Sequence, residues 1–187
     1  YSGNRCFFLF LRLRITGYEG LASHGAAIGI VVAMLLFARK IKKPFLWIMD
    51  RLCIVVALGG MFIRLGNFFN SEIIGKPTDS SFGVIFKRLG EDFPRHPAQL
   101  YEAFGYLILF FVLWVLYKKG YGQKVGFLFG IFLIALFTIR FVIEFFKENQ
   151  VAFEDALPLN MGQLLSIPFI LAGGVILYFS QKQSRKL

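Results

Sequence analysis

Five long apolar segments constrain this chain more than any other feature of its sequence. Each has roughly the 20 mainly apolar residues that an α-helix needs to cross the hydrocarbon core of a bilayer. The chain is 57% hydrophobic and only 17% charged, a balance typical of membrane proteins. We therefore predict an all-α polytopic membrane protein, with a single integral membrane domain over residues 1–187. The expected spans are about residues 21–38, 44–69, 99–117, 125–146 and 161–179.

Clusters of basic residues follow the first, third and fifth segments. By the positive-inside rule these clusters face the cytoplasm, so we predict a cytoplasmic C-terminus and an outer-side loop over residues 76–98. Three arginines within residues 1–20 oppose this orientation at the N-terminal end, where a short interfacial segment or strand is expected. The formal charge of +10 then reflects topology and contact with membrane lipids, and nucleic acid is not an expected partner. The clusters are Arg39, Lys40, Lys42 and Lys43; Lys118, Lys119 and Lys124; and Lys182, Arg185 and Lys186.

Polar side chains gather at the outer ends of all five segments. With a rise of about 1.5 Å per residue, Arg64 lies roughly 30 Å above the start of the second segment and Arg140 roughly 22 Å above the start of the fourth. His24 stands at the outer end of the first segment. Because polar groups are costly inside a membrane, this convergence predicts a functional site. Also at this depth are His96, Gln99, Tyr101, Glu102, Glu144, Asn160 and Gln163.

Two arginines at headgroup depth suit a phosphate, because the planar guanidinium forms bidentate hydrogen bonds with phosphate oxygens. A histidine within reach can act as a general base. Each residue also has a purely structural explanation: Arg140 and Glu144 are spaced to pair within one helix, and Arg64 can extend to the headgroups. From the residues alone, three functions stay open. They are a membrane enzyme acting on phospholipid, a transporter or channel with an outer-facing polar vestibule, and a structural membrane subunit.

The segment IRLGNFFNSEIIG resembles the signature of bacterial prolipoprotein diacylglyceryl transferases, G-R-x-G-N-F-x-N-x-E-x-x-G. Only Ile63, which stands where the family has glycine, departs from it. Four further segments resemble family motifs in the same order: SHGAAIG, RHPAQLYEA, RFVIEFFKENQ and NMGQLLSIP. The likeness covers residues 17–170. Because family members carry two additional N-terminal spans, we expect this chain to be the C-terminal two-thirds of such a protein. The matching signature positions are Arg64, Gly66, Asn67, Phe68, Asn70, Glu72 and Gly75.

The resemblance implies a reaction in the outer leaflet of the bacterial cytoplasmic (inner) membrane. The family transfers the diacylglyceryl group of phosphatidylglycerol to the lipobox cysteine thiol in the signal peptide of a prolipoprotein, and it releases glycerol phosphate. Catalytic roles would fall to His24 as candidate base and to Arg64 and Arg140 on the phosphate, with Glu144 positioning Arg140. No metal or organic cofactor is implied. Substrate-binding roles would fall to Arg64, Asn67, Asn70, Glu72, Gly75, Gln99, Tyr101, Glu102, Arg140 and Glu144.

Two further departures from the family pattern lie outside the signature. Leu136 and Phe137 stand where the family often has Tyr-Gly, and Ala26 replaces the second glycine of the histidine motif. Neither change removes a charged group. We therefore expect an active enzyme when the additional N-terminal spans are present.

Overall fold

A computed structural model describes residues 23–148 and 159–184. Within them the chain forms five α-helices and no β-strand, which confirms the predicted all-α class. Four of the helices, α2 to α5, are long and apolar enough to cross a membrane. The segment predicted over residues 1–20 lies outside the described residues. The α-helices are α1 (Ser23–Lys40), α2 (Phe45–Phe69), α3 (Ala98–Lys118), α4 (Phe127–Ile143) and α5 (Met161–Ser184), and short 3-10 helices are η1 (Lys87–Leu89), η2 (Tyr121–Gln123) and η3 (Glu144–Phe146).

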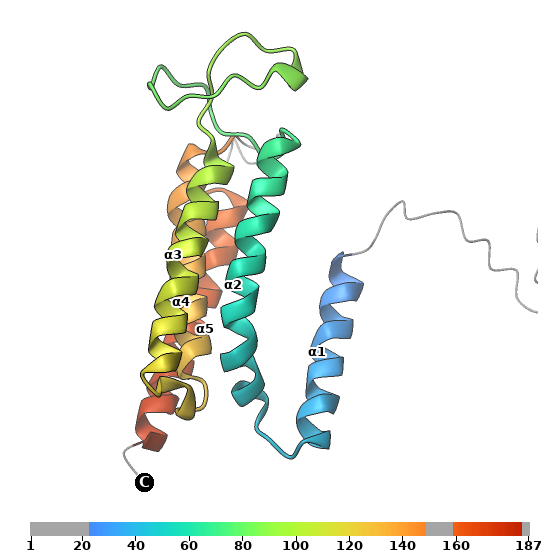
Figure 1. Ribbon diagram of the computed structural model, residues 1–187, viewed down its shortest axis with the longest axis vertical. Helices are drawn as coiled ribbons and strands as arrows, with labels where there is room; N and C mark the ends of the chain where they lie inside the picture. Colours follow the sequence, from blue (N-terminus) through green and yellow to red (C-terminus); the bar gives the residue numbers. More distant parts are fainter. Residues whose placement is uncertain (1–22, 149–158, 185–187) are drawn as a thin grey trace, which may run out of the picture.

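Helices α2 to α5 form a bundle, and α1 stands beside α2 (Figure 1). The turns that join α1 to α2 and α3 to α4 lie at one end of the molecule, together with the C-terminal end of α5. We call this the basic end, because the described residues of all three basic clusters gather there. The α2–α3 connection, residues 70–97, covers the opposite end, which we call the loop end.

Asp50 of α2 joins two helices at the basic end. Its carboxylate is fully buried and accepts hydrogen bonds from the backbone N–H groups of Gly126 at 2.6 Å and Phe129 at 2.9 Å. Helix α4 begins at this point and has no capping side chain of its own. A carboxylate from the neighbouring helix therefore caps α4 and opposes the positive end of its dipole. The apolar core, which includes Cys53 and Leu128, lies in the same half of the bundle.

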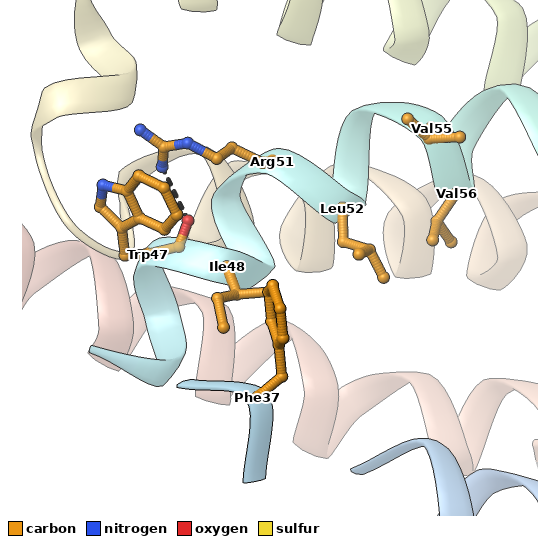
Figure 2. Close-up of a pocket in the computed structure, with 7 residues that line it drawn as sticks. All are labelled: Phe37, Trp47, Ile48, Arg51, Leu52, Val55 and Val56. Atoms are coloured by element: carbon orange, nitrogen blue, oxygen red, sulfur yellow. Dashed lines mark hydrogen bonds between the residues drawn. The ribbon is translucent and has the colours of Figure 1, made fainter. Parts of the chain in front are cut away.

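An apolar cavity of about 540 Å³ opens at the basic end, between Phe37 of α1 and the first turns of α2 (Figure 2). Arg51 is the one charged residue among the described residues that line it. The Arg51 guanidinium lies 3.4 Å from the centroid of the Trp47 ring and donates to the Trp47 carbonyl oxygen at 2.7 Å. These contacts hold the arginine on its own helix, at the end opposite the predicted polar site.

Helix α2 ends in a hydrogen-bonded turn that shapes the loop end. The Ser71 N–H bonds to the carbonyl of Phe68 and the Glu72 N–H bonds to the carbonyl of Asn67, which is the Schellman arrangement. Ser71 has a φ of 57° and takes the left-handed position that glycine commonly fills. Ile73 also has a positive φ, 55°, which is a strained conformation for a β-branched residue. Such strain is concentrated at functional sites.

Arg95 holds the α2–α3 connection against the end of α4. Its guanidinium pairs with Glu91 at 2.5 Å and Glu148 at 2.9 Å and donates to the Gly75 carbonyl at 3.3 Å. The paired guanidinium holds the pKa of the Glu91 carboxyl below its ordinary value, because it favours the charged form. Backbone hydrogen bonds between Val84 and Arg95 complete the contact. The connection is thus a folded cap on the bundle.

Candidate active site

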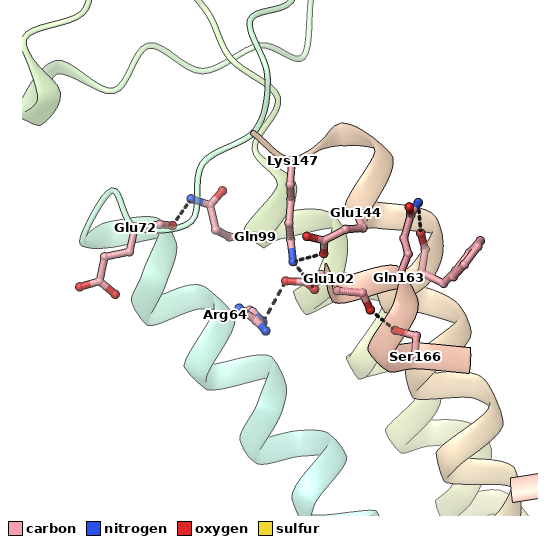
Figure 3. Close-up of polar contacts among 10 residues, drawn as sticks. Arg64, Glu72, Gln99, Glu102, Glu144, Lys147, Gln163 and Ser166 are labelled. Atoms are coloured by element: carbon pink, nitrogen blue, oxygen red, sulfur yellow. Dashed lines mark hydrogen bonds and ion pairs between the residues drawn. The ribbon is translucent and has the colours of Figure 1, made fainter. Parts of the chain in front are cut away.

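A chain of ion pairs joins three elements at the loop end (Figure 3). Glu102 of α3 is fully buried, and its two oxygens lie 2.9 Å from Nε of Arg64 on α2 and 3.0 Å from Nζ of Lys147, the residue after η3. Lys147 also pairs with Glu144 at 3.1 Å. A buried charge is costly unless it is paired. The Glu102 carboxylate pairs with both cations and therefore holds both of their side chains in place. The ion pairs thereby hold α2, α3 and the end of α4 together.

A polar cavity of about 280 Å³ opens beside these ion pairs. Arg64, Arg140 and Lys147 line it, and Glu144 is the only carboxylate among the described lining residues. With Glu102 included, three cations face two carboxylates, so one positive charge is in excess. The Nε of Arg140 is buried and has no hydrogen-bond partner among the described residues. An unpartnered guanidinium N–H beside excess positive charge suits an anionic ligand. The remaining lining residues are Ile73, Met161, Gly162 and Leu165.

Gly162 brings α5 into the site. A Cβ atom at this position would lie 2.6 Å from the carboxyl carbon of Glu144, so only glycine lets that carboxylate lie against α5. The carboxylate pairs with Lys147 instead of Arg140, and no ion pair between Glu144 and Arg140 occurs in the described part of the chain. Glu144 therefore does not hold Arg140 through an ion pair, and its role in positioning Arg140 stays a prediction. Both residues nevertheless line the cavity.

Side chains at the end of α2 support Arg64 from the other side. In the amide orientation that satisfies both neighbours, Asn67 accepts from Nη1 of Arg64 at 3.2 Å and donates to the Glu72 carboxylate at 3.2 Å. The buried Gln99 side chain donates to the backbone carbonyl of Glu72 at 2.6 Å. Asn67, Glu72 and Gln99 therefore surround the turn that carries Arg64. Figure 3 shows the Glu72 side chain pointing away from the ion pairs.

Seven of the predicted site residues do not line the cavity: Asn67, Glu72, Gln99 and Glu102, which lie around Arg64, and Asn70, Gly75 and Tyr101. Asn70 is exposed at the end of α2. The Tyr101 hydroxyl lies 3.3 Å from Nδ1 of His96, and both rings pack edge-on against Phe146. A Cβ at Gly75 would lie 2.3 Å from the backbone oxygen of His96, so this glycine permits the close approach of two backbones where the α2–α3 connection meets the end of α4. The structure therefore gives Tyr101 and Gly75 packing contacts.

His24 lies in the first turn of α1, and its side chain falls outside the described part of the structure. At about 1.5 Å per residue, His24 lies about 24 Å along α1 from Lys40, and Arg64 lies about 28 Å along α2 from Phe45. Because α1 ends and α2 begins at the same short turn, the backbones of His24 and Arg64 lie at similar distances from the basic end. The role of His24 as general base stays a prediction.

Comparison with known proteins identifies the family to which this site belongs. The family model described as prolipoprotein diacylglyceryl transferase matches residues 8–179, which is nearly the whole chain. The chain belongs to this family. The resemblance inferred from the five sequence motifs is thereby confirmed.

Curated relatives in this family carry the name phosphatidylglycerol–prolipoprotein diacylglyceryl transferase. The protein of Bacteroides fragilis is 49% identical over 172 residues, which cover 91% of this chain and 61% of the relative. That of Tolumonas auensis is 50% identical over 168 residues, which cover 89% of this chain and 65% of the relative. That of Rickettsia felis is 39% identical over 180 residues, which cover 95% and 69%. The chain thus spans about three fifths of the length of the first two relatives.

Two further residues matter within the diacylglyceryl transferase motifs. Phe137, which stands where the family often has glycine, stacks on Phe169 of α5 with ring centroids 4.3 Å apart, so this departure strengthens the α4–α5 contact. Lys147 was not among the predicted site residues, although it is 3% exposed and pairs with two carboxylates. Its spacing of three and seven residues from Glu144 and Arg140 puts all three on one helical face, a pattern that could have revealed it.

Proposed function

We propose that the protein transfers the diacylglyceryl group of phosphatidylglycerol to the lipobox cysteine of a prolipoprotein, the first step of bacterial lipoprotein maturation. The observation that carries this proposal is the cavity at the loop end, where three cations leave one positive charge in excess. Membership of the transferase family and the names of the relatives support this function over a transporter or channel.

Arg64 and Arg140 bind the phosphate of the lipid headgroup in this proposal. The unpartnered Nε of Arg140 supplies a free donor, and Arg64 is held in place by Glu102 and Asn67. A guanidinium that is already fixed loses little freedom when it binds, so its hydrogen bonds are available to the reacting group. Glu144 and Lys147 also line the cavity.

In the proposed step, the cysteine sulfur attacks the glyceryl carbon that carries the phosphate. A C–S bond forms while the C–O bond to the phosphate breaks, and the electron pair leaves with glycerol phosphate. Arg64 and Arg140 stabilise the negative charge that grows on the departing phosphate. The proton of the thiol passes to His24 as base or to the leaving phosphate.

This function requires a defined orientation in the bacterial inner membrane. We place the loop end and its cavity at the outer leaflet, where an exported prolipoprotein presents its signal peptide. The basic end and the C-terminus then face the cytoplasm, in line with the positive-inside rule. Phosphatidylglycerol reaches the cavity from the surrounding lipid, and glycerol phosphate leaves to water. All described helices belong to one integral membrane domain in this arrangement.

The decisive experiment replaces Arg140 with Gln in the full-length protein and measures the transfer of labelled diacylglyceryl from phosphatidylglycerol to a lipobox peptide. Loss of a preorganised donor to a developing oxyanion typically costs about 10²- to 10³-fold in rate, and we expect that loss here. The matched control is Arg51→Gln at the basic end, which should retain the parental rate. Parental transfer by a folded Arg140→Gln protein would show that this arginine does not bind the phosphate.

The role of His24 is tested separately by His24→Gln. If the imidazole is the base, the rate should fall and the pH dependence near neutrality, where histidine titrates, should disappear. A variant with a parental rate and an unchanged pH profile would assign proton transfer to another group.

A further inference from the structure

The α2–α3 connection presents apolar and basic side chains together beside the end of α2. Phe69, the last residue of α2, is 71% exposed. Ile85 and Leu89 are 45% and 46% exposed, and Lys87 and Arg88 of η1 are exposed as well. We call these five residues the η1 surface. Exposed apolar side chains grouped in this way mark an interaction surface.

The η1 surface is held in place by contacts with the end of α2. Nη1 of Arg88 donates to the carbonyl of Phe69 at 2.9 Å. Phe86, which is buried, packs edge-on against Phe68 with ring centroids 5.9 Å apart. Figure 1 shows the connection lying over the loop end of the bundle. The exposure of Ile85 and Leu89 is therefore built into the folded connection.

The height of η1 matches the headgroup region of a bilayer. Helix α2 has 25 residues, and at about 1.5 Å per residue it is roughly 37 Å long. The hydrocarbon core is about 30 Å thick, and the headgroup layers extend it to about 40–45 Å. The end of α2 therefore lies among the headgroups, and η1, which lies just beyond that end in Figure 1 and is bound to it through Arg88, borders the same layer. At that depth an apolar side chain and a cation are both favourable.

The charges of the η1 surface complement an anionic lipid. No described carboxylate pairs with Lys87. Of the nearby acidic residues, Glu91 is engaged by Arg95, whereas Asp79 and Asp92 lie outside η1. A lysine near an anionic membrane surface contributes to binding that surface.

We propose that the η1 surface binds the headgroup region of an anionic leaflet at the loop end. Ile85, Leu89 and Phe69 enter the interface, and Lys87 and Arg88 contact anionic headgroups. The inference does not depend on diacylglyceryl transfer, because it rests on depth, exposure and charge alone. Its consequence is a local excess of anionic phospholipid beside the mouth of the cavity.

The test places a nitroxide spin label at Leu89→Cys in the full-length protein, reconstituted into vesicles of phosphatidylcholine with phosphatidylglycerol. The signal of labelled parental protein is subtracted to remove native cysteines. We expect the label to be more accessible to oxygen than to a water-soluble nickel chelate. The control label at Asp92→Cys lies beyond Gly90, where the chain turns back with a φ of 73°, and should show the opposite preference.

A second arm tests the charge. In vesicles with phosphatidylglycerol, Lys87→Gln should lower the ratio of membrane-facing to water-facing label at residue 89 about fivefold, the contribution of one lysine near an anionic surface. In phosphatidylcholine alone it should have no effect. A label that stays water-accessible in both vesicles would overturn the proposal. A label that is shielded only after a lipobox signal peptide is added would also overturn it, and would assign the surface to the peptide.

Discussion

Replacing Glu102 with Gln tests the ion-pair network most directly, because the change removes a charge and almost no volume. The carboxylate is 0% exposed, and its oxygens lie 2.9 and 3.0 Å from Arg64 and Lys147. At an effective dielectric of about 20, unit charges about 3 Å apart interact by about 5 kcal/mol. Much of this is offset by desolvation, and removing one partner of a buried pair typically costs about 3–5 kcal/mol.

We therefore expect Glu102→Gln to lower the free energy of unfolding by about 3–5 kcal/mol, a large part of the roughly 5–15 kcal/mol of a typical domain. The assay is denaturant unfolding of the full-length protein in detergent, followed by circular dichroism. The matched control is Glu148→Gln. Its carboxylate also pairs with an arginine at 2.9 Å but is 49% exposed, so its loss should cost at most about 1 kcal/mol.

A double variant distinguishes lost charge pairing from a packing defect. Lys147→Met in the Glu102→Gln background removes the cation that has lost a partner, so the two costs should fall short of their sum by about 1–3 kcal/mol. Strictly additive costs, or equal effects of Glu102→Gln and Glu148→Gln, would refute the conclusion that Glu102 is a shared counter-ion.

Three further predictions follow from single contacts. Gly75→Ala would place a Cβ 2.3 Å from the backbone oxygen of His96. Overpacking of this kind costs about 1–3 kcal/mol, so we expect at least that loss in the free energy of unfolding, measured by denaturant unfolding. Asp50→Ala leaves two backbone N–H groups of α4 without an acceptor and should cost about 1–3 kcal/mol in the same measurement, without weakening phosphatidylglycerol binding. The pKa of Glu91 is lowered by its pair with Arg95, so its stabilisation of residues 76–98 is complete above the ordinary value of 4.5 and is lost as the pH falls through the lowered pKa. The protection factors of the loop amides, which are exchange rates corrected for the intrinsic rate at each pH, should therefore fall in acid, and Glu91→Gln should remove that pH dependence.

The helices and the depth of the site were predictable because both depend on distance along the chain. Apolar runs of sufficient length gave helix bounds within a few residues of those observed. Counting from the basic end placed Arg64, Arg140 and Glu144 in the half of their helices nearer the loop end, and all three line the same cavity. The rise per residue is fixed by the backbone, so such predictions need no knowledge of how the helices pack.

The partners of individual side chains could not be predicted, because they depend on which faces of different helices meet. Glu102 is an example: the sequence did not indicate that its carboxylate pairs with both Arg64 and Lys147 and lies outside the cavity lining. Its expected role in substrate binding stays a prediction. The capping of α4 by Asp50 joins residues 76 positions apart. Spacing within one helix allows Glu144 two partners, Arg140 and Lys147, and Lys147 is the one observed.

The position of Glu102 on α3 also bears on how the protein enters its membrane. Arg64 and Glu102 lie near the two facing ends of consecutive helices and pair across the α2–α3 hairpin. A lone arginine within a spanning helix raises the cost of insertion by about 2.5–3.5 kcal/mol. If the hairpin leaves the insertion machinery as a unit, the arginine enters the lipid already neutralised by its own hairpin. The second cation of Glu102, Lys147, then joins only after α4 has been made, so the site is completed in the order in which the chain is synthesised.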